Sequence, residues 1–186
     1  MIVLVGESGS GKTTIRDKIV SSSNFTKAIS CTTRDKREHE IEGDDYCFLT
    51  KEDFQKKIND DYFLEYAEYN ENYYGVPINQ IQEYKVAVVE PQGVEQLTKK
   101  FGQEIVVFYL QASEDTRKNR MLIRGDSLEK IEQRLRLDKI RFQDIERFVD
   151  RKVNTENNSI EEIAEIIRIT YPVLLTSKNR MREVHS

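Results

Sequence analysis

Residues 6–13 constrain the fold of this chain more than any other segment. They read Gly-Glu-Ser-Gly-Ser-Gly-Lys-Thr, they follow the apolar run Ile2–Val5, and they precede residues 14–20, whose composition suits a helix. A short buried strand, a glycine-rich turn and a helix start are the context in which the pattern G-x-x-x-x-G-K-[ST] binds phosphates. The glycines let successive backbone N–H groups point at phosphate oxygens, and the helix N-terminus adds partial positive charge. A turn without a ligand is the alternative, but strand, motif and helix all favour a phosphate site.

This loop predicts a nucleoside triphosphate bound with magnesium. Lys12 is expected to reach the outer phosphates, and the Thr13 hydroxyl is expected to be a ligand of Mg²⁺. The residues that we expect to contact the triphosphate are Gly6, Ser8, Gly9, Ser10, Gly11, Lys12, Thr13 and Thr14.

Composition limits the remaining possibilities. A chain of 186 residues with 38% hydrophobic residues is expected to form one α/β domain with small insertions. The net charge of −4 argues against nonspecific nucleic-acid binding, which needs a basic face. Cys31 and Cys47 lie in no metal-binding pattern, and reduced thiols fit a cytoplasmic protein. No apolar stretch approaches a membrane span, and the first strand leaves no room for a signal peptide, so we expect no membrane partner.

Apolar runs and helical patterns alternate along the chain. Besides Ile2–Val5, residues 86–89 and 105–110 are typical of buried parallel strands, with weaker candidates at 27–30 and 153–155. Such alternation predicts βαβ units around a parallel sheet.

The longest helical pattern covers residues 128–148. Its apolar stripe is expected to pack against the sheet, and Asp138 is expected to pair with Arg134 one turn earlier. The polar tail from Thr176 onward is expected to be frayed.

Residues 31–84 differ in composition from the rest of the chain. They contain seven of the nine tyrosines and many charges, which predicts an inserted subdomain over the phosphate loop. Six of them are Tyr46, Tyr62, Tyr66, Tyr69, Tyr73 and Tyr74, and most of these six are expected to be structural.

Several motifs together resemble the guanylate kinase family. The segment from Ser30 to Glu40 is similar to S-x-T-T-R-x-P-R-x-G-E, with Lys36 in place of proline and His39 in place of glycine. Further matches are G-x-x-Y ending at Tyr46, Glu65 followed by N-x-Y-G, R-x-x-x-R-G at residues 120–125, and I-x-x-R-L at residues 131–135. The resemblance covers residues 1 to about 170 and is specific because order and spacing agree.

The resemblance implies a three-layer P-loop NTPase fold of the α/β class, with a mostly parallel central sheet, an inserted subdomain that binds the nucleoside monophosphate, and a mobile lid. It implies one domain over residues 1–186, with these parts: a core of 1–31, 85–123 and 137–175, a monophosphate-binding subdomain at 32–84, a lid at 124–136, and a tail at 176–186.

The implied reaction is transfer of the ATP γ-phosphoryl group to GMP or dGMP. Arginines suit this chemistry because they hold phosphate through two hydrogen bonds and stabilise the charge that spreads over the transferring oxygens. By resemblance, the catalytic residues are Lys12, Arg34, Arg124 and Arg134, and Arg120, Arg124 and Asn157 are further ATP contacts. The implied GMP contacts are Ser30, Arg34, Arg37, Tyr46, Glu65, Tyr74, Gly75, Val76, Glu90 and Gln92.

Glu65 is the residue that suits guanine. A carboxylate accepts hydrogen bonds from both the ring N1–H and the exocyclic amino group of guanine, whereas the N1 atom of adenine would repel it. The alternative for Glu65 is an exposed acid in a charged strand.

Departures from the family pattern gather near the expected base site. Val76 replaces a hydroxyl residue, Val88 and Glu90 replace two aspartates, and Cys31 replaces a residue that is commonly serine. These changes lead to the hypothesis of weakened guanine affinity or a shifted acceptor, because a carbonyl that loses its donor costs about 1–3 kcal/mol.

Two other functions stay open at this point. One is a guanylate-kinase-like module without catalysis that binds phosphopeptides, and the other is a small kinase for a phosphorylated sugar. The intact Lys12, Thr13, Arg124 and Arg134 argue against the module. Whatever its function, we expect the protein to be a monomer or a weak dimer.

Overall fold

A computed structural model describes the backbone of residues 1–185 and the side chains of residues 1–180. Its centre is a five-stranded sheet in the order β2-β7-β1-β8-β9, and every neighbouring pair is parallel. The strands are β1 (Ile2–Val5), β2 (Thr26–Lys27), β7 (Lys85–Val88), β8 (Val106–Gln111) and β9 (Arg151–Asn154). The predicted α/β class with a parallel central sheet is confirmed.

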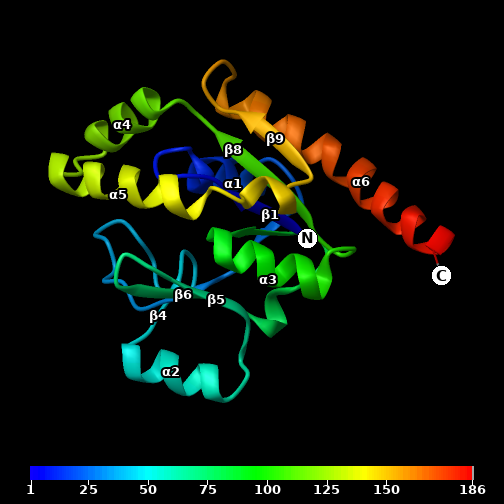
Figure 1. The fold of residues 1–186 in the computed structure, drawn as a ribbon, viewed down its shortest axis with the longest axis horizontal. Helices are drawn as coiled ribbons and strands as arrows, with labels where there is room; N and C mark the ends of the chain where they lie inside the picture. The colour runs from blue at the N-terminus through cyan, green and yellow to red at the C-terminus, as the bar shows by residue number, and fades with distance from the viewer. Residues whose placement is uncertain (186) are drawn as a thin grey trace.

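Helices cover both faces of this sheet (Figure 1). Side chains alternate along a strand, so Ile2 and Leu4 of β1 face α1 (Lys12–Ser21) and α6 (Ile160–His185). Val3 and Val5 face the other side, where α3 (Pro91–Phe101) and η2 (Ile145–Phe148) pack. The three layers explain why the central strands read as continuous apolar runs, since parallel strands buried on both faces need apolar side chains throughout.

A second sheet lies outside the central one. Its strand order is β4-β3-β6-β5, and its own core is formed by Cys31, Phe54 and Phe63. The elements of this part of the chain are β3 (Cys31–Thr32), β4 (Cys47–Phe48), α2 (Lys51–Asn59), β5 (Phe63–Tyr69), β6 (Asn72–Pro77) and η1 (Ile78–Gln80).

The strand predicted at residues 27–30 is shorter and earlier than expected. It ends at Lys27, although Ala28 N–H still donates to Val86 O at 2.9 Å. The chain then leaves the central sheet, because Ser30 O already accepts from Cys47 N–H of the second sheet at 2.9 Å.

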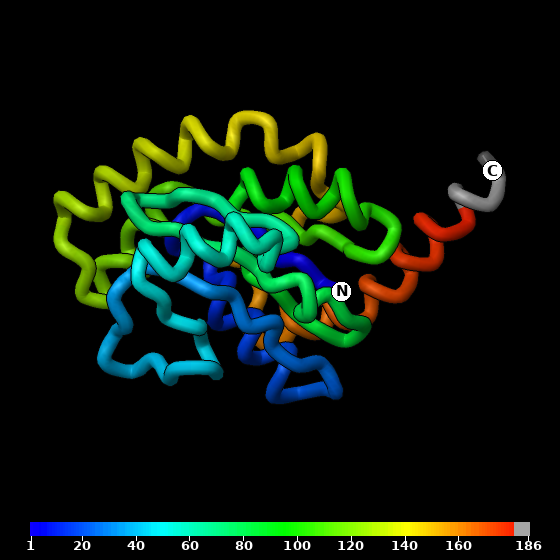
Figure 2. The backbone as a smooth tube through the Cα atoms, turned by 90° about the horizontal axis from the view of Figure 1, so that it is seen from below, coloured from blue at the N-terminus to red at the C-terminus, as the bar shows by residue number. Residues whose placement is uncertain are grey.

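The helix predicted over residues 128–148 is divided in the structure. α5 (Leu128–Arg141) packs on α4 (Glu114–Ile123) through Met121, Ile131 and Leu135, and this pair lies at the end of the molecule opposite the C-terminus (Figure 2). The chain turns at Phe142, whose ring stacks on Tyr109 of the central sheet at 5.8 Å. The predicted packing of the apolar stripe against the sheet is therefore wrong for Ile131 and Leu135, which pack on α4, and for Leu128 at the start of the stripe, which is 57% exposed.

The prediction of a frayed tail is wrong for the described residues, since α6 continues to His185. Lys178 helps to hold this helix: its Nζ donates to Gly102 O at 2.9 Å and to Ile105 O at 3.0 Å, and lies 2.7 Å from Asp150 Oδ2. Residue 186 of the predicted tail lies outside the described residues. In the part of the chain that the structure describes, no helix has the length and apolar character needed to cross a membrane.

Candidate nucleotide-binding site

A cavity of about 690 Å³ opens between the phosphate loop (residues 6–13), the second sheet and the α4–α5 pair. Its size is within the range of sites for small molecules. Most of the residues expected from the sequence line it: Gly6, Ser8, Gly9, Ser10, Gly11, Lys12, Thr13, Thr14, Arg34, Arg37, Tyr46, Tyr74, Glu90, Arg120, Arg124 and Arg134. The expected donor-side and acceptor-side cations thus share one cavity.

The phosphate loop needs its glycines for conformation. Gly9 and Gly11 have φ angles of 80° and 96°, in the left-handed region that other residues rarely adopt. A Cβ at Gly9 would also lie 2.6 Å from the carbonyl oxygen of Arg117. The loop therefore lies close against α4 and leads directly into the N-terminus of α1.

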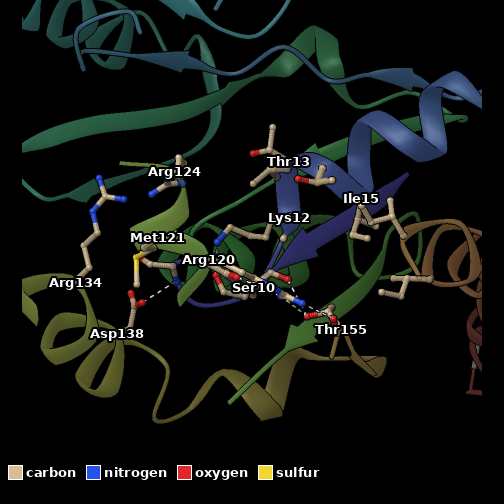
Figure 3. Close-up of a pocket in the computed structure, with 18 of the residues that line it drawn as sticks. Ser10, Lys12, Thr13, Ile15, Arg120, Met121, Arg124, Arg134, Asp138 and Thr155 are labelled. Carbon is tan, nitrogen blue, oxygen red and sulfur yellow. Dashed lines mark hydrogen bonds between the residues drawn. The ribbon is translucent and has the colours of Figure 1, made fainter. Parts of the chain in front are cut away.

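Lys12 is folded back across the mouth of the loop. Its Nζ donates to the carbonyl oxygens of Gly6 and, at 3.2 Å, of Glu7. Burial lowers the pKa of Lys12, while the negative charges of Glu90 and Asp138 oppose that shift. Figure 3 shows Lys12 and Thr13 on the loop, and on the other side of the cavity Arg124, which directly follows α4, and Arg134 of α5.

Arg120 connects the phosphate loop to Thr155. Its guanidinium donates to Gly9 O at 3.3 Å and to Thr155 Oγ1 at 3.0 Å, and the Thr155 hydroxyl in turn donates to Ser10 O at 3.1 Å. Sequence reasoning missed Thr155, which follows β9 at the carboxyl edge of the parallel sheet, where ligands commonly bind. Asn157 does not line the cavity, whereas its neighbour Asn158 does.

Arg124 and Arg134 are held together by Asp126. Arg124 forms an ion pair with Asp126, and Arg134 Nη1 lies 3.6 Å from the same carboxylate. Burial acts to raise the pKa of Asp126, but the hydrogen bond from Arg124 and both positive charges lower it below its usual value. The expected Arg134–Asp138 pair is wrong, because the Asp138 carboxylate points to the phosphate loop, where it accepts from Ser8 N–H at 2.7 Å (Figure 3).

Arg34 and Arg37 meet at a carboxylate that the sequence did not single out. Glu40 accepts two hydrogen bonds from the Arg34 guanidinium, at 2.7 and 3.0 Å, and one from Arg37 N–H at 2.8 Å. Burial opposes ionisation of Glu40, but these donors lower its pKa overall. The Arg34 guanidinium also lies 5.5 Å from the ring centre of Tyr46. Glu40 thus holds the Arg34 guanidinium directly and the Arg37 segment through its backbone, and both arginines line the cavity.

The residues expected around the base are packed together beside the cavity. Glu65 is 4% exposed, and its Oε1 accepts from Val76 N–H at 3.1 Å. Burial raises the pKa of Glu65 to about 8, with the nearby charge of Glu90 acting in the same direction. The Val76 side chain belongs to the central core with Leu64 and Val89, which explains why an apolar residue fits there. Five expected acceptor-site residues do not line the cavity: Ser30, Glu65, Gly75, Val76 and Gln92.

Gly93 of α3 makes room for the Glu65 carboxylate. A Cβ at position 93 would lie 1.9 Å from Glu65 Oε2 and 2.7 Å from Val89 Cγ1. Gly93→Ala is therefore expected to lower the free energy of unfolding by about 1–3 kcal/mol, the usual cost of overpacking a core. Urea denaturation measures this loss, and Gln92→Ala on the exposed side of α3 is the control. A Gly93→Ala variant as stable as the control would contradict this account of the packing.

Sequence reasoning missed two residues on the inner side of the loop, Tyr69 and Asp138, which both line the cavity. The sequence groups Tyr69 with tyrosines that are mostly expected to be structural, and it predicts a pair of Asp138 with Arg134. The one available signal was a lone acid on the apolar stripe of a helix, and that signal does not reveal its partner.

Comparison with known proteins places this geometry in a family. The family model described as "Guanylate kinase" matches residues 1–170. A guanylate kinase of Clostridium tetani (strain Massachusetts / E88) is 38% identical over 135 residues, which are 69% of this chain and 65% of that protein. The match thus spans about 65% of the length of that curated relative. The crystal structure of guanylate kinase from Anaplasma phagocytophilum superposes with a TM-score of 0.71 at 25% identity, over 91% of this chain and 82% of the other. The chain belongs to the guanylate kinase family.

Proposed function

We propose that this protein transfers the γ-phosphoryl group of ATP to GMP. The observation that carries the proposal is one cavity lined by both a phosphate loop, which includes Lys12, and a second set of cations, Arg34 and Arg37. A kinase that transfers a phosphoryl group from one nucleotide to another needs both sets of phosphate-binding groups. Family membership supports the same reaction.

The donor triphosphate binds at the phosphate loop. Backbone N–H groups of the loop and the N-terminus of α1 hold its oxygens, while Lys12 exchanges the carbonyls of Gly6 and Glu7 for the outer phosphates. Arg124 and Arg134 face the same space and stabilise the charge that develops during transfer. Their pairing with Asp126 keeps both guanidinium groups in place before the ligand binds.

Magnesium fits the donor site as a companion of the triphosphate. Among the described residues, no group of three His, Cys, Asp or Glu side chains could hold a metal ion by itself. The Thr13 hydroxyl lines the cavity and offers one oxygen ligand, and Mg²⁺ commonly takes its other ligands from water and substrate phosphates. The ion would neutralise phosphate charge when bound.

The acceptor phosphate binds to Arg34 and Arg37, with the hydroxyls of Tyr46 and Tyr74 as further donors. This phosphate oxygen is itself the nucleophile, so the reaction needs no separate protein base. Closure of the second sheet and the α4–α5 pair over the ligands would exclude water, which otherwise hydrolyses the donor.

Glu65 selects guanine through its carboxylate, and the substitutions around it weaken rather than abolish that selection. The Val76 side chain offers no donor for the guanine carbonyl, and its backbone N–H is already occupied by Glu65. We therefore expect the protein to keep its preference for guanine over the other bases. Its affinity for GMP should be lower than that of a protein with a hydroxyl side chain at position 76. The loss is about tenfold to a hundredfold for one missing partner.

The experiment that tests the proposal measures ADP release from ATP and Mg²⁺ with GMP, dGMP, AMP, CMP or UMP as the acceptor. The expected result is a kcat/KM for GMP at least about a hundredfold above that for AMP, CMP and UMP, and a rate that falls when EDTA removes Mg²⁺. Equal turnover of AMP, CMP or UMP would overturn the choice of a guanine nucleotide as the acceptor. Binding of a phosphopeptide without Mg²⁺-dependent ATP binding would favour the non-catalytic module instead.

A further inference from the structure

Tyr69 joins the second sheet to the phosphate loop. It is the last residue of β5, and its hydroxyl oxygen lies 2.9 Å from Ser8 Oγ. The same hydroxyl donates to Asp138 Oδ1 of α5 at 3.4 Å. Since a tyrosine has one hydroxyl proton, the Ser8 hydroxyl donates to Tyr69 while Tyr69 donates to Asp138. Three segments far apart in the chain therefore meet at this one oxygen.

Asp138 of α5 also binds the phosphate loop directly. It is 1% exposed, and its Oδ2 accepts from Ser8 N–H at 2.7 Å. Arg117 of α4 lies 3.5 Å from the same carboxylate and 3.8 Å from Glu7, so the buried negative charge has a positive partner. Both the backbone and the side chain of Ser8 are thus held by groups outside the loop.

The ring of Tyr69 is fixed as well. The Arg141 guanidinium of α5 lies 4.6 Å from its ring centre, within the range of cation–π contact. Burial raises the pKa of Tyr69, and the negative charge of Asp138 adds to this shift, so the hydroxyl keeps its proton at neutral pH. The hydroxyl is therefore available as a donor throughout the range in which a kinase would be assayed.

We propose that Tyr69 is a positioning residue that couples the second sheet, which carries the acceptor cations, to the phosphate loop, which carries the donor. This inference rests on the proposed phosphoryl transfer. When the Tyr69–Ser8–Asp138 contacts are formed, Arg34 and Arg37 face the same cavity as Lys12, and the two phosphates are held in line. Tyr69 acts through Ser8 and needs no contact with either substrate.

Tyr69→Phe tests the proposal because it removes the hydroxyl and keeps the ring. We expect kcat to fall about tenfold, the loss typical of one or two hydrogen bonds, while KM for ATP and for GMP changes less than about twofold, since ground-state binding is retained. Tyr66→Phe is the matched control: Tyr66 is on the same strand, 38% exposed, and points to the opposite side. A purely structural role would lower the unfolding midpoint without this separation of kcat from KM.

Ser8→Ala provides a second route that leaves the second sheet untouched. If Tyr69 acts through the Ser8 hydroxyl, Ser8→Ala and Tyr69→Phe lower kcat by similar factors, and the double variant is no slower than either one. Losses that multiply would overturn the coupling, as would a Tyr69→Phe variant with the kinetics of Tyr66→Phe. Failure of the proposed function appears differently, as a wild-type protein that releases no ADP with GMP.

Discussion

Lys12→Met is expected to lower kcat for ADP release by about a thousandfold. The amine is the cation nearest the outer phosphates in the proposed complex, and removal of one preorganised charge or donor at a reacting centre costs about 10²–10³ in rate. The fold should survive the change. Because burial lowers the pKa of Lys12, its charged form opposes folding at neutral pH, and methionine removes that charge while it keeps most of the side-chain volume.

Steady-state kinetics with GMP as the acceptor measures this loss, and thermal unfolding checks the fold. Lys18→Met is the control, because Lys18 is on the same helix and pairs with Glu161 at the surface. GMP binding measured by calorimetry should be unchanged in both variants, since Lys12 contacts the donor side. A Lys12→Met enzyme within tenfold of the wild type would mean that Lys12 keeps its carbonyl partners and takes no part in transfer.

The parts of the fold that could be predicted are those that local sequence determines. β1 and β8 are apolar runs because both faces of a parallel sheet are covered, and the turn after β1 needs glycine where φ is positive. Ser159 before α6 is another local signal, since a serine followed three residues later by glutamate is typical of a helix start, and its hydroxyl accepts from Glu162 N–H at 3.2 Å. These signals depend on neighbours in the chain, so a single sequence contains them.

The features that could not be predicted depend on partners distant in the chain. Helical spacing places Asp138 on one face with Arg134, but the choice between Arg134 and Ser8 is made by tertiary packing, which brings the loop against α5. The end of α5 at Arg141 likewise follows from the stacking of Phe142 on Tyr109, not from a local helix breaker. The boundaries of the acceptor subdomain and of the lid stay predictions, as do the roles of individual site residues, which the point variants test.

The affinity for GMP is expected to improve as the pH rises from 6 to 8. Glu65 must be ionised to accept both guanine N–H groups, and burial raises its pKa to about 8 in the free protein. KM for GMP should therefore fall about tenfold for each unit that the pH rises toward that value, and level off above it.

The free energy of unfolding should change in the direction opposite to that of the affinity for GMP. A carboxyl whose pKa is raised in the folded state stabilises the protein at low pH and loses that contribution as the pH rises from about 4.5 to 8.

Glu65→Gln separates this carboxyl from the other titrating groups. The NH₂ group of glutamine would face one of the two guanine N–H groups, and two donors cannot form a hydrogen bond with each other. Because both hydrogen bonds to a charged carboxylate are lost, kcat/KM for GMP should fall by about 10² to 10⁴. The variant should also lose the pH dependence of KM and become less sensitive to pH in urea denaturation, because glutamine does not titrate. Glu68→Gln on the exposed face of the same strand is the control and should keep the wild-type behaviour. A Glu65→Gln enzyme that retains GMP selectivity and the slope of KM against pH would show that another group recognises the base.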